Sequence, residues 1–87
     1  MSRKTELEEI FSRMLHDPDD DPSEYVIYVI DRGSSSGLRR IWGDEIQDVK
    51  RGFLVLWNAE IPVHRVIRVE RGGRVIWERG RRARGRR

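Results

Sequence analysis

The order of the sequence patterns constrains this chain most, because the one helical pattern comes first and every later pattern is of the β type. Apolar residues recur at helical spacing from Leu7 to Leu15. Thr5 and Glu8 have the spacing of a capping box. Pro18 ends the pattern, since proline cannot continue a helix, and an acidic loop with a second proline follows. The sequence therefore predicts one N-terminal amphipathic helix.

The remainder of the folded part is predicted to be β structure. Tyr25–Ile30 is the most β-prone stretch, is apolar on both sides and is expected to be a central strand. Gly72-Gly73 is a two-residue hairpin signal. Further strands are predicted at 38–42, on a sheet edge, and at 53–57, 61–71 and 74–79, whereas 43–50 fits a helical turn or a loop. These elements predict an α+β fold: one N-terminal amphipathic helix packed on a four- to five-stranded antiparallel sheet.

Charge divides the chain into three blocks. Residues 1–24 carry three basic and eight acidic side chains, residues 25–79 carry ten basic and seven acidic, and residues 80–87 carry five arginines and no acid. The last block has no core-forming side chain, so we predict a single domain over 1–79 and a disordered Arg-rich tail over 80–87. Without the tail the body is slightly acidic. Specific binding of an anion must then depend on a few placed arginines and His64.

Composition excludes several classes of protein. The chain has no cysteine, which excludes a disulfide framework, a thiolate metal site and a cysteine nucleophile. Its two histidines, His16 and His64, lie far apart, so we expect no metal site and no cofactor. No apolar run approaches the roughly 20 residues that span a bilayer, and the start lacks the apolar stretch of a signal peptide. We therefore expect a soluble, cytoplasmic protein that does not enter a membrane.

The last hairpin predicts which side chains share a face. If Gly72-Gly73 form the turn and no bulge interrupts the pairing, Arg68 lies opposite Trp77, and opposed residues share a face. One face is then core-like and carries Ile67, Val69 and Ile76. The other face carries His64, Val66, Arg68, Trp77 and Arg79. That second face has groups that bind RNA, namely arginines for phosphate and a tryptophan for stacking. The alternative is that Trp77 is buried under the helix and that Arg68 and Arg79 only line its rim.

A second group of candidate ligands follows the first strand. The loop Asp31–Gly37 has two glycines and three serines, and Arg39 and Arg40 come directly after it. Such a loop can cradle a phosphate, or it can be a plain solvated loop. It lacks the P-loop pattern, so nucleotide hydrolysis is not indicated. The acidic run over 17–21 fails the EF-hand spacing, and a solvated loop is expected there.

Two segments resemble a known family. Ile61–Ile67, with the sequence IPVHRVI, and Gly73–Trp77, with GRVIW, resemble the signature of a small, mainly archaeal family labelled the RNA cyclic group end recognition domain. Tyr28–Gly33 and two shorter stretches, 38–41 and 51–53, fit in order, so that the resemblance covers 5–79. It implies recognition of RNA ends with a 2′,3′-cyclic phosphate, and it carries over Asp31, Arg32, Gly33, His64, Arg65 and Trp77. One departure is His16, because the family commonly has tryptophan there.

We therefore expect a non-catalytic module that binds a terminal RNA phosphate through His64, Arg65, Asp31, Arg32, Gly33, Arg68 and Trp77. Its setting would be RNA repair or processing, with an RNA-repair enzyme as a possible partner. One alternative is a cyclic-phosphodiesterase-type enzyme that uses His64, although the sequence places no second acid–base group beside it. Another is a protein-interaction domain in which the acidic segment 17–24 and the basic tail pair within or between chains.

Overall fold

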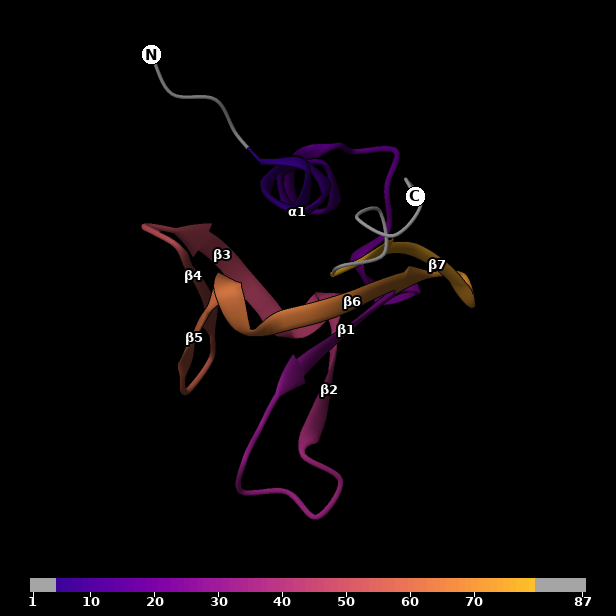
Figure 1. The fold of residues 1–87 in the computed structure, drawn as a ribbon. Helices are drawn as coiled ribbons and strands as arrows, with labels where there is room; N and C mark the ends of the chain where they lie inside the picture. The colour runs from indigo at the N-terminus through magenta and orange to yellow at the C-terminus, as the bar shows by residue number, and fades with distance from the viewer. Residues whose placement is uncertain (1–4, 80–87) are drawn as a thin grey trace.

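A computed structural model describes residues 5–79 of the chain, and its single helix, α1 (Glu6–His16), precedes all the strands (Figure 1). The predicted capping box is confirmed. The Thr5 hydroxyl accepts a hydrogen bond from the Glu8 backbone N–H, and the Glu8 carboxylate accepts one from the Thr5 N–H, both at 3.2 Å. The helix ends at His16, before Asp17-Pro18, as proline requires.

Residues 5–79 contain two antiparallel sheets. The first has the strand order β2-β1-β6-β7, and the second has the order β3-β4-β5. The strands are β1 (Tyr25–Ile30), β2 (Leu38–Trp42), β3 (Ile46–Lys50), β4 (Phe53–Leu56), β5 (Glu60–Pro62), β6 (Val66–Arg71) and β7 (Arg74–Glu78). Short 3₁₀ turns are η1 (Pro22–Glu24), η2 (Gly43–Glu45) and η3 (Val63–Arg65). The predicted α+β class is confirmed, with β2 at a sheet edge and β1 in the interior. The chain passes between the two sheets at η2 and at η3: η3 interrupts the segment predicted as one strand over 61–71, and 46–50, within the stretch predicted as a helical turn or a loop, is strand β3.

The core lies between α1 and the two sheets (Figure 1). Its buried side chains come from every layer: Leu7, Phe11, Met14, Tyr25, Ile27, Val29, Ile41, Ile46, Leu54, Leu56, Ile61, Val66 and Val69. In β1 the burial alternates, so that Tyr25, Ile27 and Val29 point into this core. The other three side chains of β1 point to the opposite side of the sheet. The strand is therefore covered on one face only, although it is apolar on both.

A bulge in the last hairpin corrects the predicted faces. Glu70 pairs with Val75 as expected, but the register then shifts, and Val69 lies opposite Trp77. Trp77 therefore shares a face with buried Val69, not with Arg68, and packs half-buried against the core. Ile76, predicted to face the core, is 38% exposed. The alternative in which Trp77 is buried describes the structure better, with Arg79 over its ring.

A second bulge lies where β1 meets β6. Tyr28 pairs with Arg68, but the next residue, Val29, pairs with Val66, so Ile67 is the extra residue. As a result Val66 and Val69 both point into the core and are completely buried. The prediction that Val66 lies on the same face as His64 and Arg68 was wrong. A bulge inserts one residue without changing the composition of the strand, and strict alternation cannot reveal it.

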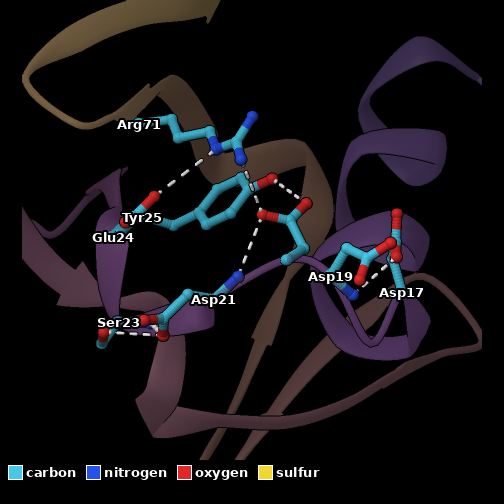
Figure 2. Close-up of polar contacts among 8 residues, drawn as sticks. Asp17, Asp19, Asp21, Ser23, Glu24, Tyr25 and Arg71 are labelled. Atoms are coloured by element: carbon cyan, nitrogen blue, oxygen red, sulfur yellow. Dashed lines mark hydrogen bonds and ion pairs between the residues drawn. The ribbon is translucent and has the colours of Figure 1, made fainter.

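The acidic segment before β1 is tied to Arg71 of β6 through the carboxylates of Asp20 and Glu24 (Figure 2). Asp20 has only 4% of its side chain exposed and accepts a hydrogen bond of 2.7 Å from the Tyr25 hydroxyl. It also lies 3.1 Å from Nη2 of Arg71 and accepts the Asp21 N–H. The Arg71 guanidinium lies over the Tyr25 ring. The expectation of a solvated loop was therefore wrong at Asp20, which is a satisfied buried charge.

Tyr25 is expected to make the domain less stable at high pH. Burial, followed by the hydrogen bond to Asp20, raises the pKa of Tyr25 from 10.0 to about 12. The unfolded chain releases this proton at the lower pH, so the contribution to stability is full below pH 10 and is lost as the pH rises through 12. The expected loss is about 2 kcal/mol. Urea unfolding between pH 9 and pH 12 measures it, and the Tyr25→Phe variant should lack this part of the decline. Equal declines in both proteins would contradict the prediction.

Candidate functional site

The end of β1, the start of β6 and the end of β7 lie at the same end of the four-stranded sheet. β1 and β6 are antiparallel, and Val29 pairs with Val66, so the residues after β1 lie beside those before β6. The Arg79 N–H donates to the Ile67 carbonyl at 2.9 Å, which brings the end of β7 to the same place. We call the residues gathered there the strand-end cluster: Asp31, Arg32, Gly33, His64, Arg65 and Arg79. The register thus places the end of β1, which Asp31, Arg32 and Gly33 follow, beside the start of β6, which His64 and Arg65 precede.

Arg79 holds the strand-end cluster in shape. Its Nη2 donates to the carbonyls of His64 and Val66, at 3.0 and 2.8 Å, and its Nε donates to Val66 at 3.0 Å. Its guanidinium also lies 5.5 Å from the ring centre of Trp77. Arg79 therefore fixes the backbone of η3 and is a positioning residue. The sequence predicts Arg79 on the same face as His64, as a group for phosphate, whereas in the structure its donors bind the backbone before β6.

The exposed side chains of the strand-end cluster that are available to a ligand are cationic or can donate a hydrogen bond. His64 and Arg65 are exposed on η3, and Arg32 is exposed in the loop after β1. Within residues 5–79, no carboxylate forms an ion pair with any of the three. An arginine without an acidic partner keeps its planar set of donors available to a phosphate. The edge therefore presents a small positive surface.

Asp31 and Gly33 shape the loop. The Asp31 carboxylate accepts the Gly33 N–H at 3.0 Å, and the Asp31 N–H donates to the Gly37 carbonyl at 2.8 Å. The Ser34 hydroxyl lies within hydrogen-bond distance of the carbonyls of Asp31 and Leu38. These donors serve the loop itself. The loop accordingly positions Arg32, and the Gly33 N–H is not aimed at a ligand.

Arg68 is placed apart from the strand-end cluster. It lies on the side of the sheet that faces away from α1, between Glu70 at 3.1 Å and Glu78 at 3.4 Å. The hydrogen bond that Arg68 donates to the Glu70 carboxylate raises the pKa of Arg68. Trp77 is separated from Arg68 by the bulge described above and packs against the core. Arg68 and Trp77 were both predicted as site residues. In the structure Arg68 is paired with two glutamates and Trp77 packs against the core, so neither belongs to the strand-end cluster.

A cavity of about 260 Å³ lies between α1 and the hairpin of β3 and β4. It is lined by Glu8, Ser12, Leu15, His16, Val49, Lys50, Arg51 and Gly52. The Gly52 carbonyl accepts the Val63 N–H at 2.8 Å, so that the tip of this hairpin is joined to η3. His16 is thus on the wall of a cavity with two cations. No three metal-ligating side chains gather in residues 5–79, and no helix there has the length and apolarity to cross a membrane.

Comparison with known proteins identifies relatives along nearly the whole chain. The sequence model of the family described as MJ1316 RNA cyclic group end recognition domain matches residues 4–79. A UPF0248 protein of Methanopyrus kandleri is 99% identical over 74 residues, which are 85% of this chain and 100% of the relative. A UPF0248 protein of Thermococcus gammatolerans is 36% identical over 81 residues, 92% of this chain and 96% of the relative. No solved structure is significantly similar to the chain.

Proposed function

Because the chain belongs to the MJ1316 RNA cyclic group end recognition domain family, we propose that it is a non-catalytic module that binds RNA ends carrying a 2′,3′-cyclic phosphate. The observation that carries the proposal is that exposed His64 and Arg65 directly precede β6 and exposed Arg32 follows β1, at the end of the sheet where Val29 pairs with Val66. A cyclic phosphate shares one negative charge between two oxygens outside the ring. One guanidinium and a neighbouring imidazole N–H match such an anion in charge and in donor number.

The geometry of the cluster supports binding more than catalysis. Opening a cyclic phosphate needs general acid–base groups within hydrogen-bond reach of the attacking and leaving oxygens. His64 can act as one such group. The nearest carboxylate in the cluster, that of Asp31, already accepts the Gly33 N–H. A module that holds the cyclic end intact would act beside an RNA-repair or RNA-processing enzyme in the cytoplasm, which is part of the same proposal.

Replacing His64 or Arg65 with alanine tests the end-specific role. Either change should weaken binding to a short RNA with a 2′,3′-cyclic phosphate about 10- to 100-fold, because each removes a charge-assisted or positioned hydrogen bond. Binding to the same RNA with a 3′-hydroxyl should be unchanged. Fluorescence anisotropy across a salt series measures both. Arg74→Ala is the matched control, since Arg74 is an exposed arginine at the opposite end of the β6–β7 hairpin.

Two results would overturn this proposal. Equal losses on the cyclic and the hydroxyl end would mean that the cluster binds RNA without recognising the end. Conversion of the cyclic phosphate to a linear one, seen by mass analysis of the RNA after incubation, would make the protein an enzyme.

A further inference from the structure

The side of the first sheet that faces away from α1 collects aromatic, aliphatic and arginine side chains. The register places Val26 opposite Trp42, Tyr28 opposite Arg40 and Ile30 opposite Leu38. On the other flank, Tyr28 lies opposite Arg68. We call this side the open sheet face. Its residues are Val26, Tyr28, Ile30, Leu38, Arg40, Trp42, Arg68, Glu70 and Val75.

The open sheet face has no covering layer in residues 5–79. Trp42 is 45% exposed, Ile30 43% and Leu38 39%, whereas α1 packs on the other side of the same sheet (Figure 1). Single exposed apolar residues are ordinary, but a contiguous set of them marks a binding surface. A large aromatic ring that is left half in water on an ordered strand gains most by stacking against a flat, apolar surface.

The two arginines of the open sheet face differ in their ion pairs. Arg68 is held between two glutamates, and its guanidinium lies 5.3 Å from the ring centre of Tyr28. Arg40 lies 5.9 Å from the ring centre of Trp42, and within residues 5–79 it has no carboxylate in ion-pair distance. Arg39 and Arg32 are also exposed, on or next to β2. On the open sheet face the β2 side therefore carries Arg40 without an ion pair in the described part of the chain, the Glu45 carboxylate accepts the Trp42 N–H at the end of β2, and the two carboxylates that pair with Arg68 lie on the β6–β7 side.

A ligand for this face must offer flat rings and anionic links together. Single-stranded RNA has both, since its bases stack on aromatic rings and on guanidinium planes, and its phosphates pair with arginine. We propose that the open sheet face binds the nucleotides next to the RNA end, with Tyr28 and Trp42 as stacking platforms and Arg40 as a phosphate contact. The placement of the RNA end rests on the function proposed above.

The open sheet face is continuous with the strand-end cluster. Ile30 and Leu38 form the last pair of β1 and β2, directly before the loop that carries Arg32. Strands rise about 3.4 Å per residue, so the Tyr28 row lies roughly 7 Å from this pair and the Trp42 row roughly 14 Å. An RNA whose last phosphate is at His64 and Arg65 can therefore reach Trp42 only if it is a few nucleotides long.

Replacing Trp42 tests this proposal. Trp42→Ala should weaken binding of the full chain to an eight-nucleotide single-stranded RNA about 5- to 100-fold, by the free energy of one base–aromatic stack. The loss should be equal for cyclic and hydroxyl ends, and it should be absent with a dinucleotide. Trp57→Ala is the matched control, because Trp57 is 84% exposed after β4 and outside the face. Trp42→Leu keeps apolar volume and removes the ring, so it reports on binding if the alanine variant is unstable.

The outcomes separate the two proposals. If Trp42→Leu and Trp42→Ala bind the eight-nucleotide RNA like the unmodified chain, the open sheet face is not an RNA surface. The same conclusion holds if either change instead alters self-association in sedimentation, which would identify a second copy as the occupant. If the unmodified chain binds both RNA ends equally while the Trp42 variants lose affinity, the open sheet face binds RNA and the end-specific function fails.

Discussion

Replacing Gly43 with alanine is expected to destabilise the domain by about 3 to 4 kcal/mol, a large part of the total stability of a protein of this size. A Cβ atom at Gly43 would lie 2.3 Å from the Pro22 carbonyl oxygen, 2.8 Å from the Met14 sulfur and 2.9 Å from the Tyr25 Cβ. The sulfur can move, but the carbonyl belongs to the backbone of η1. The chain must therefore shift where α1, η1 and η2 pack together. Urea unfolding monitored by circular dichroism measures the loss.

Gly33→Ala is the control for this prediction. A Cβ at Gly33 would meet only the Asp31 carboxylate, at 3.5 Å, which is an ordinary contact, and its backbone does not have a positive φ. The free energy of unfolding of this variant should differ from that of the unmodified protein by no more than about 0.5 kcal/mol. A loss below 1 kcal/mol for Gly43→Ala would mean that the close approach of η1 and η2 is not a tight constraint.

Replacing Asp20 with alanine is expected to cost about 2 to 4 kcal/mol. The change leaves the buried Tyr25 hydroxyl without its acceptor and removes the closer of the two carboxylates that pair with the Arg71 guanidinium (Figure 2). Leaving a buried donor unsatisfied costs about 1 to 3 kcal/mol, and hydrogen bonds to charged groups are at the upper end of their range. The free energy of unfolding in urea at pH 7 measures the effect.

A double-mutant cycle separates the contributions. In the Tyr25→Phe background, Asp20→Ala should cost about 1 kcal/mol less than it does alone, because the unsatisfied hydroxyl is already gone. Asp19→Ala is the control in the same loop, because Asp19 is exposed. Its backbone N–H donates to the Asp17 carboxylate, and replacing its side chain leaves this hydrogen bond in place. Additive losses for Asp20 and Tyr25 would show that the 2.7 Å hydrogen bond is not an energetic link.

The helix and the turns could be predicted because their signals are local. The capping box joins Thr5 and Glu8, three residues apart, and both of its hydrogen bonds are present. Gly72 and Gly73 both have positive φ, 59° and 83°, which glycine adopts without strain in a two-residue hairpin turn. Glu70 with Val75, the second pair from that turn, also has the register that a two-residue turn requires.

Prediction failed where one residue was inserted in a strand. Two bulges rotate the faces of β6 and β7, so that Val66 and Trp77 turn toward the core and Ile76 turns outward. Nothing in the composition of these strands marks the bulges. The core accepts the bulged arrangement because it buries Val66 and Val69 together, and this choice depends on β1 and on the helix.

The roles of the candidate site residues remain a prediction. His64, Arg65 and Arg32 came from the resemblance to the family, and all three are exposed near one edge of the sheet. The positioning role of Arg79 was not predicted, because its partners, the carbonyls of His64 and Val66, lie 15 and 13 residues away and are backbone atoms. A residue that fixes a backbone from such a distance has no sequence signal of its own.

The sequence by itself determined the elements: one capped helix, a β-rich remainder, and a body whose net charge is slightly acidic without its last eight residues. Those properties follow from propensities and spacings within a few residues. Only the tertiary structure decided that the Asp20 side chain is buried, that Gly43 must have no side chain, and that residues 5–79 leave the open sheet face uncovered. Each of these depends on which distant segments meet, because burial and close approach belong to pairs of segments and not to either one alone.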